Sequence, residues 1–242
     1  LDERRETILK SINEQDKLSP ELEQQIYAAD NKTTLEDLYL PYKPKRRTKS
    51  QIAKEAGLEA LALSLLENQA QEPLLLAAQY LNPEANINTP QDALDGARYI
   101  LLDVFAENAA LLAKLRERFT YEGILCAKVI AGKEEQGAKF SDYFAHQELV
   151  KNIPSHRALA ILRGNNEGFL NIAIEYPELQ TLARGEVSHF EQLIINEFTI
   201  TDNLAASNWL RECVRLTWKA KIYPSLENEL LGIMREQADT EA

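Results

Sequence analysis

Apolar residues recur at three- and four-residue intervals through most of this chain, and no other feature constrains the fold as strongly. Ile8 and Ile12 have this spacing in the charged opening segment, and Leu22, Ile26 and Ala29 have it in the next segment. Such spacing places the apolar side chains on one face of a helix, which can then pack against other helices. The sequence therefore predicts an all-α fold.

Helix start and stop signals divide this pattern into elements. Thr89 is expected to cap a long helix that begins at Pro90, because a capping residue before proline is typical of a helix start. The apolar face of that helix is expected to continue to Phe119. Another helix is predicted over residues 155–164, with Gly164 as the residue that ends it.

Two short segments have strand character. Residues 169–176, FLNIAIEY, alternate between apolar and polar side chains, and residues 124–130 form a weaker candidate. A strand pair alone is only marginally stable in water. We therefore expect at most a minor strand pair, attached to the helices.

Composition excludes several classes of protein. Hydrophobic residues make up 45% of the 242, as in an ordinary folded domain. No apolar run approaches the roughly 20 residues of a membrane span, and the net charge of −11 argues against general coating of duplex DNA. The lone Cys126 and Cys213 fit a reducing, cytoplasmic compartment and are interpreted as small core residues. Because the chain begins at Leu1 rather than Met, we expect a fragment of a longer protein.

Motifs of catalysis are not found in the sequence. The three histidines, His146, His156 and His189, have neither the HExxH spacing nor a Cys/His spacing typical of zinc ligands. No GxSxG nucleophile motif and no glycine-rich phosphate loop is present. We therefore expect no enzymatic activity, no metal site and no cofactor.

The basic segment, residues 43–49, has the opposite charge to its surroundings. It follows Pro41 closely and contains Pro44. Without this segment, the rest of the chain has a net charge of −16. A charge run is often only solvated surface. The functional alternative is a phosphate contact, with Tyr39 and Tyr42 able to stack on an unpaired base. The candidate nucleic-acid-binding residues are Lys43, Lys45, Arg46, Arg47 and Lys49.

Residues 51–58, QIAKEAGL, resemble the first helix and turn of a helix-turn-helix. Ala53 and Gly57 have the spacing that close helix packing and a left-handed turn require. The following EALALSLLEN, however, offers apolar and acidic side chains where a recognition helix needs Arg, Lys, Asn or Gln. Two helices packed at an angle are therefore the favoured interpretation.

The string SHRALAILRG at residues 155–164 also contains candidates for anion binding. His156, Arg157 and Arg163 are the residues that would meet the anion. The alternative is that the two arginines form ion pairs with carboxylates of packed neighbours, while the core receives Leu159, Ile161 and Leu162. We favour this structural interpretation.

Four strings in this order resemble the Tex family of bacterial transcription accessory proteins. They are LEDLYLPYKPKRRTKSQIAKEAGLEALA (35–62), DALDGARYIL (92–101), GKEEQGAKFSDYF (132–144) and SHRALAILRGNNEG (155–168). The resemblance covers nearly the entire chain. It implies a multihelical region of a multidomain nucleic-acid-binding protein whose ribonuclease-H-like, helix-hairpin-helix and OB-fold RNA-binding domains lie outside this sequence.

The resemblance also implies an organisation and a function. We expect a discontinuous helical lobe formed by residues 1–57 and 131–242, with a helix-turn-helix-like subdomain of residues 58–130 inserted into it. The parent protein is expected to bind RNA or DNA and to assist transcription, with a weak phosphate contact at residues 43–49. The alternative is a protein-interaction scaffold that docks the remaining domains or the transcription machinery.

Overall fold

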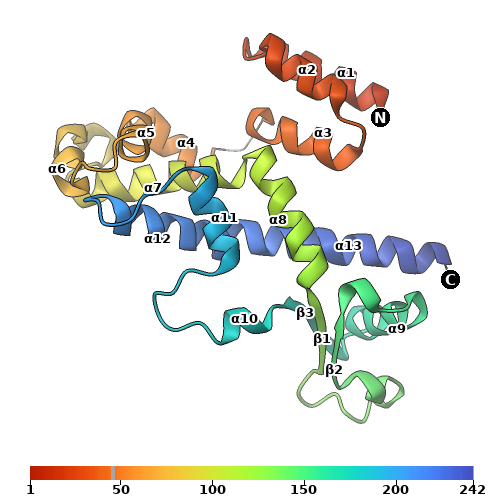
Figure 1. Cartoon of the computed structure of the whole chain (residues 1–242). Coiled ribbons are helices and arrows are strands. Elements are labelled where there is room, and N and C mark those ends of the chain that lie inside the picture. The colour runs from red at the N-terminus through yellow and green to blue at the C-terminus, as the bar shows by residue number, and fades with distance from the viewer. Residues whose placement is uncertain (45–46, 242) are drawn as a thin grey trace. The chain divides into compact units, whose positions relative to one another are not determined.

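The computed structural model describes residues 1–44 and 47–241, except for the side chain of residue 241, and it is mostly helical as predicted (Figure 1). The chain forms two compact units. The first contains residues 1–114 and 189–221, and the second contains residues 115–188 and 222–242. The inserted subdomain of residues 58–130 stays a prediction. No helix in the described part of the chain is both long and apolar enough for a membrane span.

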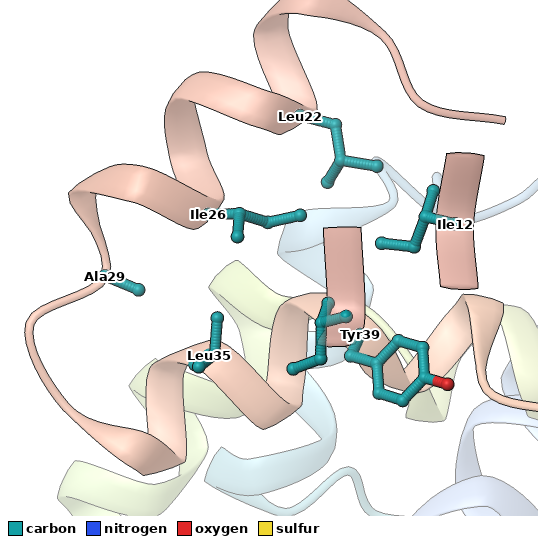
Figure 2. Close-up of a cluster of buried hydrophobic side chains, with 7 residues drawn as sticks. Ile12, Leu22, Ile26, Ala29, Leu35 and Tyr39 are labelled. Carbon is teal, nitrogen blue, oxygen red and sulfur yellow. The ribbon is translucent and has the colours of Figure 1, made fainter. Parts of the chain in front are cut away.

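Three helices at the start of the chain enclose a small core of their own. They are α1 (Asp2–Glu14), α2 (Pro20–Ala28) and α3 (Lys32–Tyr39), and a short 3-10 turn, η1 (Leu40–Tyr42), follows. The predicted apolar faces meet here, because the side chains that they contribute are buried together (Figure 2). The cluster consists of Ile8, Ile12, Leu22, Ile26, Ala29, Leu35 and Tyr39.

In the first unit, the long helix α7 (Pro90–Ala106) is contacted by α4, α5 and α6. Gly96 of α7 has no room for a Cβ atom, which would lie 2.2 Å from Cδ1 of the buried Leu58. Its missing side chain therefore allows residues before and after Gly57 to pack closely on α7. The elements here are α4 (Lys49–Glu55), α5 (Glu59–Glu67), α6 (Pro73–Ala77), η2 (Ala78–Tyr80), η3 (Pro83–Ala85) and α7 (Pro90–Ala106).

The predicted long helix is in fact two helices. Thr89 caps α7 as expected, and a reciprocal hydrogen bond with Asp92 completes a capping box. The helix ends at Ala106, however, and α8 (Ala109–Glu122) begins after a break. The side chain of Asn108 accepts a hydrogen bond from the Leu111 amide at 2.9 Å, so it acts as a new N-terminal cap. The expectation of one helix to Phe119 was therefore wrong.

Helix α12 (Ser207–Thr217) packs against α7, and α11 (His189–Glu197) packs against α12. The buried Gln69 side chain fixes the loop before α12, because its amide nitrogen donates to the Thr199 carbonyl and its oxygen accepts from the Thr201 amide. The ring of Phe190 stacks on Trp218 with centroids 4.4 Å apart. These elements are α11 (His189–Glu197), α12 (Ser207–Thr217) and a π-helical segment, η6 (Trp218–Ile222).

A three-stranded antiparallel sheet lies in the second unit. Its strands are β1 (Ile124–Val129), β2 (Ala145–Leu149) and β3 (Leu170–Glu175). Their order in the sheet is β2-β1-β3, with β1 in the centre (Figure 1). Strands β1 and β3 confirm the two predicted strands, and β2 is an additional one. The other elements are η4 (Ala138–Tyr143), η5 (Val150–Asn152), α9 (Ser155–Asn166), α10 (Pro177–Gln180) and α13 (Tyr223–Glu241).

Gly164 has a different role from the one that its position predicted. It lies inside α9, which continues to Asn166. A Cβ atom at Gly164 would meet Cδ1 and Cγ of Leu170 at 2.4 and 2.9 Å, so glycine is needed for the contact of α9 with β3. Gly168 adopts the left-handed conformation instead, with φ of +85°. The prediction that the helix ends at Gly164 was wrong because the glycine serves helix packing.

Three aromatic side chains pack together where α8 contacts the sheet and α13. The ring of Phe119 lies 4.9 Å from that of Tyr176 and 5.8 Å from that of Tyr223, measured between centroids. The Tyr176 hydroxyl donates to the Phe119 carbonyl at 2.5 Å, and the Tyr223 hydroxyl donates to the Ile174 carbonyl. Burial raises the pKa of both tyrosines above the ordinary value.

Both cysteines are buried and free, which supports their interpretation as core residues. Burial is the main factor that raises the pKa of Cys126 to about 12, and the neighbouring Glu175 carboxylate, 3.3 Å from its sulfur, adds to this effect. Burial also raises the pKa of Cys213. A high pKa keeps a thiol protonated and weakly nucleophilic at neutral pH.

Candidate nucleic-acid interface

The basic segment connects the N-terminal core to α4. At its start, the Lys43 amide donates to the Leu40 carbonyl at 3.4 Å, which closes the η1 turn. At its end, Thr48 caps α4 by accepting a hydrogen bond from the Gln51 amide at 3.1 Å. Both ends of the segment are therefore fixed by local hydrogen bonds.

The described members of the segment are exposed. Lys43, Arg47 and Lys49 are exposed to solvent, whereas Lys45 and Arg46 lie outside the described residues. Arg47 donates to the carboxylate of Glu55 at 2.8 Å, with 68% and 48% of the two side chains exposed. An exposed pair of this kind contributes at most about 1 kcal/mol. A phosphate can therefore replace Glu55 as the partner of Arg47 at little cost.

Lys49 brings the segment to α7. Its Nζ lies 3.5 Å from the hydroxyl oxygen of Tyr99 and 5.1 Å from the centroid of that ring. The guanidinium of Arg98 lies 5.7 Å from the same centroid. The sequence does not indicate the proximity of Arg98 and Tyr99 to the segment, because about fifty residues separate them from Lys49 and no local motif includes them.

The aromatic residues that precede the segment do not match their predicted role. Tyr39 is only 7% exposed, belongs to the N-terminal core, and shares a hydrogen bond of 2.9 Å with Ser11. Tyr42 packs against the same core. Because its ring is buried, the prediction that Tyr39 stacks on a base was wrong.

Acidic groups near the segment are engaged in ion pairs. Arg4 donates to both carboxylate oxygens of Glu36, at 2.6 and 3.1 Å. This hydrogen bonding holds the pKa of Glu36 below its usual range, and the charges of Arg4 and Lys43 lower it further. Glu36 therefore stays ionised but already has a cationic partner.

Helices α4 and α5, which carry the helix-turn-helix resemblance, are joined by a turn at Gly57, and both pack against α7. Gly57 adopts φ of +88°, and the Leu58 amide donates to the Ala53 carbonyl at 3.1 Å across the turn. The apolar side chains of α5 at Leu61 and Leu65 are buried. The exposed face of α5 has no basic residue, which fits the favoured interpretation of the two helices as packing elements.

The structure confirms part of the structural interpretation of the string at residues 155–164. Arg157 forms an ion pair with Glu148, a partly buried carboxylate that also lies 3.3 Å from Nε2 of His146. Ile161 and Leu162 are buried, and Arg163 is exposed. Within residues 1–44 and 47–241, no three His, Cys, Asp or Glu side chains are grouped as metal ligands would be.

Comparison with known proteins assigns this chain to a family. The family model described as Tex central region-like matches residues 68–242, which is most of the chain. Transcriptional accessory protein Tex of Neisseria gonorrhoeae is 53% identical over 242 residues, which cover 100% of this chain and 31% of that protein. Protein YhgF of Escherichia coli strain K12 is 48% identical over 243 residues, with the same two shares.

A human relative matches over a shorter region. S1 RNA-binding domain-containing protein 1 of Homo sapiens is 33% identical over 148 residues, which cover 58% of this chain and 15% of that protein. The chain spans about a third of the length of the bacterial relatives. The family model covers most of the sequence, and the bacterial relatives match along all of it. This chain therefore belongs to the Tex family.

Proposed function

We propose that this chain is a non-enzymatic module of a transcription accessory protein that binds nucleic acid. In this proposal the basic segment, residues 43–49, makes a weak contact with phosphates, and the rest of the module is scaffold. The exposure of Lys43, Arg47 and Lys49 on a chain that is otherwise strongly acidic carries the proposal.

The chemistry of the segment fits phosphate rather than a single acidic side chain. Arginine can bind a phosphate through two parallel hydrogen bonds, and lysine supplies a flexible point charge. The acidic remainder of the chain repels a polyanion elsewhere and so limits contact to this segment. The names of the relatives, a transcriptional accessory protein and an S1 RNA-binding domain-containing protein, agree with such a partner.

Salt dependence tests the proposal. We expect labelled single-stranded RNA to bind weakly at low salt, with a logarithmic salt slope of up to about −3.5 if all five basic residues neutralise a phosphate of the single strand. Replacing those five residues with Gln should abolish binding, because the variant has lost every proposed phosphate contact. Fluorescence anisotropy at low and near-physiological salt measures both effects.

A matched variant separates the site from the total charge. Five exposed basic residues outside the segment, when replaced with Gln, give the same net charge while the segment stays intact. They are Lys10, Lys17, Lys128, Arg184 and Lys219. This control should keep most of the binding. Equal binding by the segment variant and the original chain would refute the assignment of the site.

A groove in the second unit favours a second candidate function, a protein-interaction scaffold. The groove has a volume of about 320 Å³, and α8, α9 and α13 contribute to its lining. Its walls include Leu226, Leu230 and Ile233, and Ile233 is 39% exposed.

Pull-down after nuclease treatment compares the two functions. Loss of all partners with nuclease supports nucleic-acid binding, and partners that are kept, then lost in an Ile233→Asp variant, support the scaffold.

A further inference from the structure

A small pocket adjoins the end of the basic segment. It has a volume of about 250 Å³ and lies where α4, the turn after η3, and α7 meet. Small-molecule sites usually have volumes of roughly 300–1,000 Å³. The size of this pocket suits a single ring system better than a complete ligand.

The walls of the pocket are mixed in character. Ile52, Ile87 and the alanines of α4 provide apolar surface, and Ile52 is 47% exposed. Tyr99 provides an aromatic ring, and Asp92 and Asp95 provide carboxylates. The Asp95 carboxylate accepts a hydrogen bond from Gln91 at 2.9 Å and lies 4.0 Å from the Arg98 guanidinium, but it is 44% exposed, so it can also accept from the edge of a base.

Positive charge lies beside the aromatic ring. Lys49 and Arg98 both approach Tyr99, with the cationic atoms 5.1 and 5.7 Å from the ring centroid. Lys49 is also the last basic residue of the segment 43–49 and lines the pocket. A strand whose phosphates contact Arg47 and Lys49 therefore reaches the pocket at Lys49.

This combination matches the two parts of a nucleotide. An aromatic ring with apolar walls suits the face of a base, while a cation on a flexible stem suits the adjoining phosphate. A base within a duplex is already stacked and paired, so only an unpaired base can enter such a pocket.

We propose that this pocket, the Tyr99 pocket, receives one base of a single-stranded nucleic acid whose adjoining phosphates contact Lys49 and Arg47. The inference rests on the proposed function and extends it from a phosphate contact to a base contact. Because stacking is tolerant of sequence, the pocket selects single-stranded over double-stranded nucleic acid rather than one sequence over another.

The experiment compares two strands with the same phosphates. One is a single-stranded RNA oligonucleotide, and the other is an oligonucleotide of equal length and charge without bases. Stacking of one base typically contributes roughly 5- to 150-fold in affinity. We expect the strand with bases to bind about tenfold more tightly at fixed salt. A Tyr99→Ala variant should lose this difference and keep the weaker affinity for the strand without bases.

A second variant fills the pocket without changing charge. Ile52→Met places a longer, non-aromatic side chain at a half-exposed position of the pocket, so it should also reduce the preference for bases. The matched control is Leu63→Met, because Leu63 is 42% exposed and lies on α5 outside the pocket lining. The control should keep the preference.

The outcomes distinguish this inference from the proposed function. Equal, salt-sensitive binding of the strands with and without bases would refute the base pocket and leave the phosphate contact in place. A preference for bases that survives in both pocket variants would also refute it. If neither strand binds at low salt, the proposed function itself fails, and the base pocket fails with it.

Discussion

Replacing Phe119 with Ala is expected to lower the free energy of unfolding of the second unit by about 3–5 kcal/mol. The Phe119 side chain is 1% exposed, and its ring contacts Tyr176 of the sheet and Tyr223 of α13. Truncation removes buried apolar surface and leaves a cavity among rings that cannot collapse freely. Chemical denaturation, followed by circular dichroism, measures the change.

The second unit can be observed separately from the first. Both tryptophans, Trp209 and Trp218, belong to the first unit, so their fluorescence reports on that unit, while amide exchange in β1 reports on the second. The substitution should accelerate exchange in β1. The control is Tyr121→Ala on the same helix. Tyr121 is 64% exposed and contacts Lys151, so its loss should cost no more than about 1 kcal/mol. Equal effects of the two substitutions would contradict the proposed core role of Phe119.

Alkaline pH is expected to destabilise the fold steeply. The pKa values of Cys126, Cys213, Tyr176 and Tyr223 are all raised in the folded chain, mainly by burial. In the unfolded chain these groups lose their protons near pH 8.5 for cysteine and about pH 10 for tyrosine. Above those values the folded state binds more protons than the unfolded state, so stability falls as pH rises.

The magnitude follows from the same linkage. Each fully shifted group removes up to about 1.4 kcal/mol per pH unit between its unfolded and folded pKa. For Cys126 this window extends from about pH 8.5 to its raised pKa of about 12. Melting temperatures measured from pH 8 to 11 should decline, and Tyr176→Phe should decline less steeply because one titrating group is gone. A flat profile to pH 11 would contradict the burial of these protons.

The sequence predicted the features of the fold that local chemistry determines. Amphipathic spacing identified the apolar faces of α1 and α2, and the capping signal at Thr89 identified the start of α7. Strands β1 and β3 have enough apolar and β-branched residues to be recognised. In each case the determining residues lie within a few positions of one another.

The missed features depend on partners that are distant in sequence or on competing local bonds. Strand β2, AHQEL, forms through backbone pairing with β1 rather than through its own side-chain pattern. The sequence predicts a helix end at Gly164, because it does not show that this glycine packs against Leu170. The basic segment is evident from the sequence. The contact of Tyr99 with Lys49 is not, because it depends on how α7 packs in the folded chain.

The division of the chain affects the order in which the protein can form as it leaves the ribosome. The first unit needs residues 189–221 to supply α11 and α12, so its Phe190–Trp218 stack and the Gln69 hydrogen bonds to Thr199 and Thr201 must wait for them. The three strands of the sheet follow α7 in sequence but are synthesised before residues 189–221. The second unit in turn needs residues 222–242, which supply α13, so neither unit can be completed before part of the other has been made. The first unit begins to emerge first but can be completed only after the three strands have been made.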